Sequence, residues 1–224
     1  MIFSDLGEAD AARVIHEQAD DFRRSGTEVE WKVYGHDRPE NLEALLRAEG
    51  FVPDEPETLV VLGLSDRVLD GPEVGGVEVR RVTDEGGLRD AATAHEAAFG
   101  PGDRPFFERW AGSLGTSDQA WFVAYVDQAP VATGRLEMPE GRSFAGLYGG
   151  GTAPGYRHRG VYRKLVSVRA GVARARGYRY LTVDARESSR PILERLGFVP
   201  LTTTRAWVLR PGPVPDASPG AAPV

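Results

Sequence analysis

The chain has 224 residues, of which 27 are Lys or Arg and 33 are Asp or Glu, so its formal net charge is −6. This acidic balance argues against non-specific nucleic-acid binding, and the absence of cysteine excludes disulfide scaffolds, Cys-ligated zinc, iron–sulfur clusters and thiol nucleophiles. The sequence has no apolar run of about 18 residues and no basic, apolar leader, so we expect a cytoplasmic protein without a membrane span. Its four histidines are scattered, and no metal site is expected.

Apolar patterning in the first part of the chain predicts alternating helices and strands. A helix, a strand, a helix and a strand are expected at 4–24, 29–35, 38–50 and 58–64. The following stretch, DGPEVGG at 70–76, is rich in Gly and indicates a linker.

The patterning after the linker predicts a mixed domain. We expect a strand at 77–82, a helix at 83–99 and a short helix at 104–111. Three antiparallel strands should follow at 120–126, 130–138 and 143–152. A long helix is expected at 161–176 and a strand at 180–183. A short helix at 190–196 and a last strand at 205–210 should follow. The long helix places Val161, Leu165, Val168 and Val172 on one face, which predicts that these four residues are buried.

An internal repeat links two distant segments. GFVP at 50–53 recurs 147 residues later at 197–200, and in both places a helical segment precedes it and a strand-like segment follows it. The match predicts a duplicated half-domain. We therefore expect a half-domain at 1–70, a linker at 71–76 and a complete domain at 77–210. The Pro- and Ala-rich tail at 211–224 is expected to be disordered.

The most informative stretch is GGGTAPGYRHRGVYRKLV at 149–166, where an Arg-rich loop joins a glycine-ending strand to the long helix. Free N–H groups and the positive end of the helix dipole suit such a helix start to binding phosphate. Gly160 lets the backbone approach a ligand closely, and Arg157 and Arg159 add positive charge. The spacing fits neither the nucleotide P-loop nor the dinucleotide-binding fingerprint, so another kind of phosphate loop is predicted.

This loop resembles the pyrophosphate loop, Q/R-x-x-G-x-G/A, of the GNAT superfamily of N-acetyltransferases. RHRGVY at 157–162 has the Arg and the first Gly, with Tyr162 in place of the final Gly or Ala. A later family signature, a short helix ending in L-G-F, is present as PILERLGF at 191–198. The resemblance covers 77–210 and implies an α/β fold. Its central sheet would be mixed, mostly antiparallel and flanked by helices, here with an N-terminal partial GNAT-like repeat.

The resemblance also implies acetyl-CoA as co-substrate. Its pyrophosphate would lie on the backbone amides of 159–162, and the strand before the loop would bind the pantetheine arm and polarise the acetyl carbonyl. Glycines at 149–151 suit that strand because they permit a bulge and a close ligand, and a tight backbone crossing without a ligand is the alternative. The expected CoA contacts are Gly150, Gly151, Thr152, Arg157, His158, Arg159, Gly160, Val161, Tyr162 and Ser189.

Direct acetyl transfer needs an unprotonated amine, donors for the oxyanion and a proton for the leaving thiolate. The family's usual acid is a tyrosine four residues before the glycine of L-G-F, and Leu193 stands there. Tyr148 and Tyr162 are replacement candidates, although Tyr148 can equally be a packed aromatic and Tyr162 can line the CoA channel. The strand before the loop lacks the carboxylate that some members use as a base. Glu137 is then the nearest acid, and His95 is a second titratable candidate.

We therefore expect an enzyme that moves an acetyl group from acetyl-CoA to a primary amine of a small acceptor by direct transfer. Phe106, Phe107 and Trp110 can wall the acceptor pocket or belong to the core. The expected partner is a small-molecule amine, with neither nucleic acid nor membrane, and the sequence leaves the oligomeric state open. Two alternatives remain: a non-catalytic acyl-CoA-binding module, and an acyltransferase that uses a hydroxyl acceptor or a longer acyl-CoA.

Overall fold

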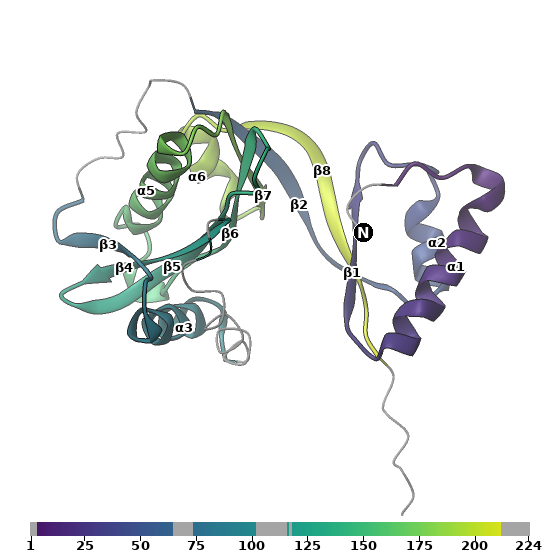
Figure 1. Ribbon diagram of the computed structural model, residues 1–224, viewed down its shortest axis with the longest axis horizontal. Coiled ribbons are helices and arrows are strands. Elements are labelled where there is room, and N and C mark those ends of the chain that lie inside the picture. Colours follow the sequence, from purple (N-terminus) through teal and green to yellow (C-terminus); the bar gives the residue numbers. More distant parts are fainter. Residues whose placement is uncertain (1–3, 65–73, 102–115, 117, 212–224) are drawn as a thin grey trace, which may run out of the picture. The chain divides into compact units, whose positions relative to one another are not determined.

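The computed structural model describes residues 4–64, 74–101, 116 and 118–211 (Figure 1). The short helix expected at 104–111 lies outside these residues, as do 71–73 of the expected linker and 212–224 of the expected tail.

The described elements follow the predicted order of helices and strands. The strands are β1 (Val29–Tyr34), β2 (Val52–Gly63), β3 (Val77–Arg81), β4 (Gln119–Val126), β5 (Ala129–Glu137), β6 (Phe144–Thr152), β7 (Tyr180–Ala185) and β8 (Val199–Leu209). The helices are α1 (Glu8–Ser25), α2 (Leu42–Ala48), α3 (Glu85–Phe99), the 3-10 turn η2 (Pro154–Tyr156), α5 (Val161–Ala175) and α6 (Arg190–Arg195). The strands form a mixed, mostly antiparallel sheet in the order β1-β8-β2-β7-β6-β5-β4-β3, which confirms the expected α/β fold.

The chain divides into two compact units, which we call the terminal unit (Met1–Glu57 with Thr202–Val224) and the central unit (Thr58–Leu201). The domain segments expected at 1–70 and 77–210 stay a prediction, and the boundaries of the compact units differ from them. The reason is that β2 and β8 each begin in one unit and end in the other.

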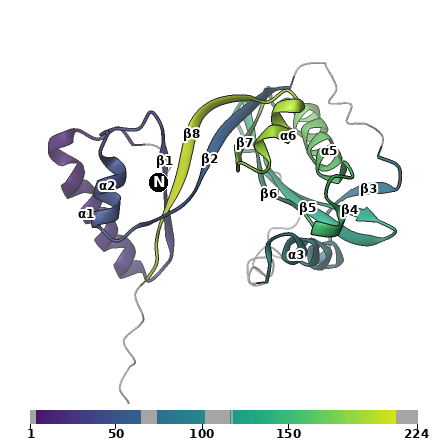
Figure 2. The same cartoon turned by 180° about the vertical axis from the view of Figure 1, so that it is seen from behind.

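The terminal unit packs α1 and α2 on one side of β1 (Figure 2). Helix α1 buries a residue at every fourth position, as an amphipathic helix with one covered face must. The buried core joins both helices to β1 and to the end of β8, and it consists of Ile15, Ala19, Trp31, Val33, Leu42, Leu46, Phe51, Trp207 and Leu209.

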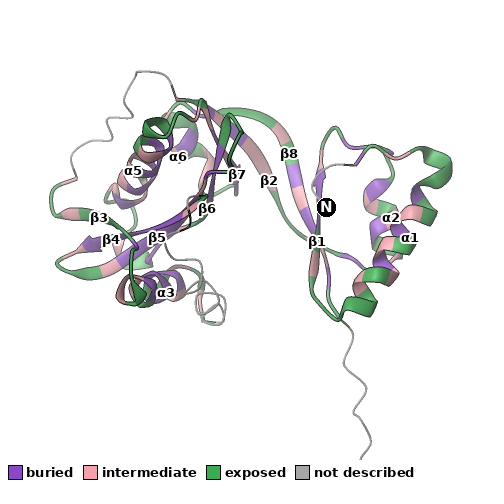
Figure 3. Ribbon diagram, viewed as in Figure 1, coloured by how far each residue is buried: buried purple, intermediate pink, exposed green. Residues whose placement is uncertain are grey.

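The central unit is a sheet covered on both faces. Helix α3 lies on one face, and α5 and α6 lie on the other (Figures 1 and 2). The Asp84 side chain accepts a hydrogen bond from Gly87 N at 2.8 Å, so it caps α3. The strands between the helices are mostly buried (Figure 3). Side chains beneath α5 and α6 form the larger hydrophobic cluster, and Trp121 and Val123 meet α3 on the opposite face.

Helix α5 buries a face that is rotated from the predicted one. Val161 and Leu165 are fully buried, as expected, but Val168 and Val172 are only partly buried. The prediction was wrong for these two valines, because an arginine, Arg169, occupies the central buried position instead.

The two GFVP segments have the same local geometry. Gly50 and Gly197 both adopt a positive φ, +83° and +95°, where each ends a helix. The amide of the following residue, Phe51 or Phe198, donates a hydrogen bond of 3.1 Å to the carbonyl of a buried leucine five residues earlier. Strands β2 and β8 then begin at once, six residues before the sequence predicted. Their first halves are largely exposed and polar, and so carry little hydrophobic signal.

The same 147-residue offset relates the strand registers. Val60 of β2 pairs with Val183 of β7, while Trp207 of β8 pairs with Trp31 of β1. Trp207 lies 147 residues after Val60. The neighbouring pairs along both ladders correspond in the same way. The duplicated half-domain itself stays a prediction, and these registers are consistent with it.

Phe198 gives a test of the central core, because its side chain is 2% exposed whereas its neighbour Val199 is 58% exposed. We expect Phe198→Ala to lower the free energy of unfolding by about 3–5 kcal/mol, through lost burial and an unfilled cavity. The matched control Val199→Ala should change it by less than about 0.5 kcal/mol. Urea unfolding followed by circular dichroism measures both, and equal stabilities would contradict this packing.

Candidate active site

Strands β6 and β7 pair over only three residues. The parallel ladder runs from Phe144 opposite Tyr180 to Gly146 opposite Thr182, and both strands continue beyond it. From Leu147 onward, the β7-facing edge of β6 therefore has no ladder partner among the described residues of β7. Backbone N–H and C=O groups on such an edge can pair with an extended ligand that carries amide groups.

A bulge interrupts β6 in the same region. Thr133 of β5 pairs with Gly151, but Arg135 pairs with Tyr148, so β6 has one residue more than β5 between these pairs. Gly149 adopts a φ of +56° there, which favours glycine. A Cβ on Gly149 would lie 3.9 Å from Trp121, so Tyr148 and Gly149 both face α3.

Neighbouring side chains fill the space that side chains on the next two glycines would need. A Cβ on Gly151 would lie 2.4 Å from the ring of Phe99, at the end of α3. A Cβ on Gly150 would lie 3.2 Å from the ring of Tyr162 on the α5 face. Close packing on both faces therefore leaves no room for larger side chains at Gly150 and Gly151.

The loop after β6 leads directly to the start of α5. Gly160 precedes the helix with a φ of +82°, and the first helical hydrogen bond runs from Lys164 N to Gly160 O at 3.0 Å. The amides of residues 160–163 precede that bond, so helical pairing leaves them available to an anion. A Cβ on Gly160 would also lie 2.9 Å from Val74, so any larger residue would be strained there.

The cations of the loop divide into two roles. Arg157 donates hydrogen bonds to the carbonyls of Thr152 at 3.0 Å and Ala98 at 3.3 Å, which tie the loop to β6 and α3. Arg159 and His158 are exposed, and the Arg159 guanidinium lies 5.6 Å from the ring centroid of Tyr156. Arg159 therefore presents its charge to solvent at the start of the helix.

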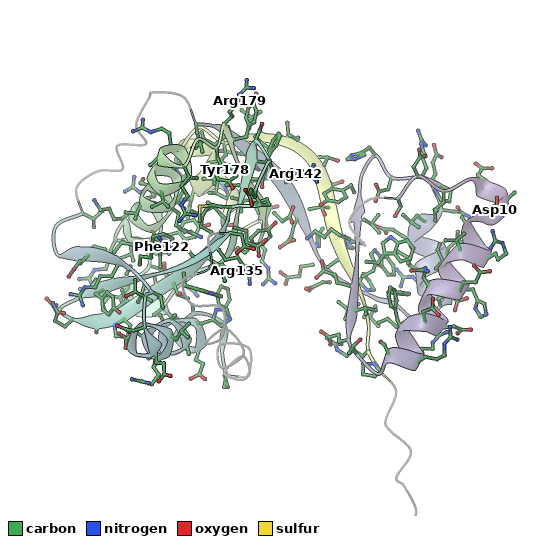
Figure 4. All side chains as sticks on the ribbon, in the orientation of Figure 1. Asp10, Phe122, Arg135, Arg142, Tyr178 and Arg179 are labelled. Atoms are coloured by element: carbon green, nitrogen blue, oxygen red, sulfur yellow. The ribbon has the colours of Figure 1, made fainter. Side chains whose placement is uncertain are left out.

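A polar cluster lies on the α3 face of the bulge. Arg135 projects from β5 (Figure 4) and lies 5.6 Å from the ring centroid of Trp121 and 5.3 Å from that of Tyr148. Its Nη2 is 2.6 Å from Glu137 Oε1. Tyr148, which is 41% exposed, folds its ring over Gly146. The two sequence candidates Tyr148 and Glu137 are thus brought together on either side of one arginine.

A second polar pair lies on the opposite, α5 face and was not predicted from the sequence. Arg169 is 1% exposed, and its guanidinium lies over Gly134, where a Cβ would be 2.6 Å from Nη1. Its Nη2 is 3.4 Å from the Cβ position of Gly150, beside Tyr162. Burial lowers the pKa of Arg169 to about 10 and raises the pKa of Tyr162, while the Arg169 charge acts to lower the latter. The signal in the sequence was an arginine four residues after Leu165 on an otherwise apolar helix face.

The remaining sequence candidates have other positions. Leu193 is fully buried in the core, and Ser189 donates a side-chain hydrogen bond to Arg186 O at 3.2 Å. His95 is 9% exposed, and its ring centroid lies 4.6 Å from that of Phe99. The three aromatics considered for the acceptor pocket, Phe106, Phe107 and Trp110, lie outside the described residues.

Comparison with known proteins adds the family and the fold. Residues 88–198 match the model of the Acetyltransferase (GNAT) family. A functionally unknown conserved protein from Staphylococcus epidermidis shares 18% identity, over 93% of this chain and 83% of that one, with a TM-score of 0.72. A GCN5-related N-acetyltransferase from Kribbella flavida also shares 18% identity, over 95% of this chain and 80% of that one, with a TM-score of 0.67. A tandem GNAT protein from the clavulanic acid biosynthesis pathway shares 16% identity, over 90% of this chain and 70% of that one, with a TM-score of 0.62.

At these identities the likeness is one of fold. No curated protein matches the sequence. Among the described residues, no helix is long and apolar enough to cross a membrane.

The contact between Arg169 and Gly134 can be tested through stability. We expect Gly134→Ala to lower the free energy of unfolding by about 1–3 kcal/mol, because the new methyl group would overlap an enclosed guanidinium. A Cβ on Gly171, an exposed position of α5, would meet no atom within 4 Å. Gly171→Ala should therefore raise stability by about 0.5–1 kcal/mol through helix propensity. Thermal unfolding compares the two, and a neutral Gly134→Ala would contradict the contact.

Proposed function

Residues 88–198 are a GNAT acetyltransferase domain, and on this premise we propose that the protein transfers an acetyl group from acetyl-CoA directly to the primary amine of a small acceptor. The family's activity is acyl transfer from an acyl-CoA. The observation that carries the proposal is the continuity of three features of the central unit. The β6 edge that lacks a ladder partner among the described residues of β7 leads to the glycine bulge and then to the amides that precede the first helical hydrogen bond of α5.

Acetyl-CoA would bind along this path. Its pyrophosphate would accept hydrogen bonds from the backbone amides of 159–162, with Arg159 adding a charge at the surface. The pantetheine amides would pair with the β6 edge from Leu147 to Thr152. Arg157 would act indirectly, because its hydrogen bonds to Thr152 O and Ala98 O hold the loop in place.

The bulge would place the thioester where the chain can stabilise charge. An acyl transfer passes through a tetrahedral oxyanion, and preorganised backbone N–H donors stabilise that charge well because they need no rearrangement. Glycines at 149–151 allow such donors to approach the carbonyl without an intervening side chain. The acetyl group fits this description, and longer acyl chains are the first alternative that an assay should include.

The polar cluster of Tyr148, Arg135 and Glu137 would form the acceptor side in this proposal. An amine acceptor is a cation near neutral pH, with a reference pKa of about 10.4 for a lysine-like amine. Glu137 would attract this cation and accept its proton, while the 2.6 Å contact with Arg135 fixes the carboxylate orientation.

The function is tested by measuring thiol release from acetyl-CoA and longer acyl-CoAs, with a panel of small amines and matched alcohols. We expect release with acetyl-CoA and at least one amine, and an N-acetyl product by mass spectrometry. Release with alcohols alone, or with longer acyl-CoAs alone, would favour the alternative acyltransferase. Tight acyl-CoA binding without release would favour the non-catalytic module, which the buried Leu193 at the family's acid position would suit.

The phosphate loop has a test in binding. We expect Arg159→Glu to weaken acetyl-CoA binding by at least about tenfold, equivalent to 1.4 kcal/mol, because a carboxylate would repel the pyrophosphate. The matched control is Arg174→Glu, an exposed charge reversal in the last turn of α5, the helix that follows the loop, and it should leave the affinity unchanged. Calorimetric titration measures both. Equal affinities of the two variants would place the pyrophosphate elsewhere.

The acceptor side has a test in kinetics. We expect Glu137→Gln to raise KM for the best amine of the panel by about tenfold, because a hydrogen bond to a charged group is lost. KM for acetyl-CoA should stay the same. Glu140→Gln, an exposed carboxylate in the turn between β5 and β6, is the control. An unchanged amine KM in Glu137→Gln would remove this residue from the acceptor side.

A further inference from the structure

The buried cation on the α5 face has a charge that the described structure does not neutralise. Arg169 Nε donates to Leu165 O at 3.2 Å and Nη1 donates to Arg135 O at 3.1 Å, so both bonds go to neutral carbonyls. Nη2 is buried and has no hydrogen-bond partner among the described residues. Burying a guanidinium without a carboxylate is unfavourable, so packing alone does not explain an arginine at this position.

The free side of the guanidinium faces the β6 bulge and Tyr162. Nη2 is 3.4 Å from the Cβ position of Gly150, and Tyr162 Oη is 3.7 Å from the same point. One charge and one phenol thus converge on the same glycine from the α5 face. In the proposed function this glycine lies beside the thioester.

The two side chains are also coupled electrostatically. Burial raises the pKa of Tyr162, and Arg169 is the one charged group among the described residues that acts to lower it. A buried phenol is a weak acid, because its phenolate is poorly solvated. A fixed cation beside it stabilises the phenolate and makes proton transfer easier.

We propose that Tyr162 is the general acid for the leaving thiolate, and that Arg169 is the positioning residue that holds its phenol at the bulge and stabilises the phenolate. The inference rests on the proposed acetyl transfer. Glu137 takes the first proton from the protonated acceptor amine, as in the proposed function. The amine nitrogen then forms the new bond to the carbonyl carbon and loses its second proton to solvent. The carbon–sulfur bond breaks, its electron pair stays on sulfur, and sulfur takes the proton from Tyr162 Oη. The phenolate then regains a proton from solvent.

This assignment uses the tyrosine on the side of the sheet opposite the acceptor cluster. Tyr148 lies on the α3 face with Arg135 and Glu137. Tyr162 is on the other face, so acid and acceptor would approach the thioester from different sides. Leu193, at the position of the family's usual acid, has no proton to give.

The kinetic test is a double-mutant cycle in the full-length chain. Tyr162→Phe should lower kcat by at least about tenfold, with acetyl-CoA affinity within about threefold of the wild type. Arg169→Met, which keeps the volume but removes the charge, should lower kcat in the same way. The double variant should be no slower than Tyr162→Phe, because Arg169 acts through the phenol. Arg169→Lys, which keeps the charge, should recover part of the lost kcat.

Controls separate this role from packing. Tyr178→Phe removes a hydroxyl that donates to Pro139 O at 3.0 Å, and Arg174→Met removes an exposed charge from the same helix. Both should leave kcat unchanged. The proposal is overturned if Arg169→Met lowers kcat as much in the Tyr162→Phe background as it does in the wild type. It is also overturned if kcat of Arg169→Lys is no higher than that of Arg169→Met, or if Tyr148→Phe loses more kcat than Tyr162→Phe. Arg169→Gln replaces Arg169→Met if the latter does not fold.

A second measurement does not depend on activity. With all tyrosines replaced by 3-fluorotyrosine, the ¹⁹F resonance missing from the Tyr162→Phe variant belongs to residue 162. Its titration midpoint should move to higher pH in Arg169→Met, because the phenolate loses its neighbouring cation. An unchanged midpoint overturns the pair. If the wild type releases no thiol but the titration midpoint of residue 162 still shifts in Arg169→Met, the proposed function is overturned, and the acid role with it.

Discussion

The extra residue in β6 is the constraint on which the candidate site depends. It shifts the register against β5 by one residue and turns two successive positions, Tyr148 and Gly149, toward the same face. It also coincides with the region where β6 has stopped pairing with β7. A regular strand would present alternating side chains and satisfied backbone groups. Here the β6–β7 ladder ends after Gly146 and the bulge follows directly, so backbone groups without a β7 ladder partner lie beside an irregular stretch of β6, where a ligand that binds by main-chain hydrogen bonds can pair.

The alternation of side chains along β5, opposite the bulge, divides the polar groups of the site into two sets. Arg135 and Glu137 alternate with Gly134 along β5, so the first two face α3 while Gly134 faces α5. The absence of a side chain on Gly134 creates the space that the Arg169 guanidinium fills. Each face therefore has one arginine at the bulge. Arg135 is paired with a carboxylate, whereas Arg169 bonds only neutral carbonyls among the described residues.

Sequence could predict the parts whose signal is local. The RHRGVY loop and the glycine at the start of α5 both follow from short-range backbone chemistry. It could not predict features that depend on a partner strand or helix. The bulge requires the register of β5, and the burial of Arg169 depends on a glycine that lies 35 residues earlier in the chain. Arg157 was expected at the phosphate because its charge fits, yet its carbonyl partners are visible only in three dimensions.

The strand registers extend the likeness of the two GFVP segments beyond sequence. In both units a helix, a strand and a second helix precede the positive-φ glycine. These elements are α1, β1 and α2 before Gly50, and α5, β7 and α6 before Gly197. The strand that follows each glycine then leaves its unit: β2 ends against β7, and β8 ends against β1. A chance repeat of four letters would not fix the residue-by-residue pairing of two ladders. The duplicated half-domain expected from the sequence stays a prediction, and the two registers are consistent with it whatever function the central unit has.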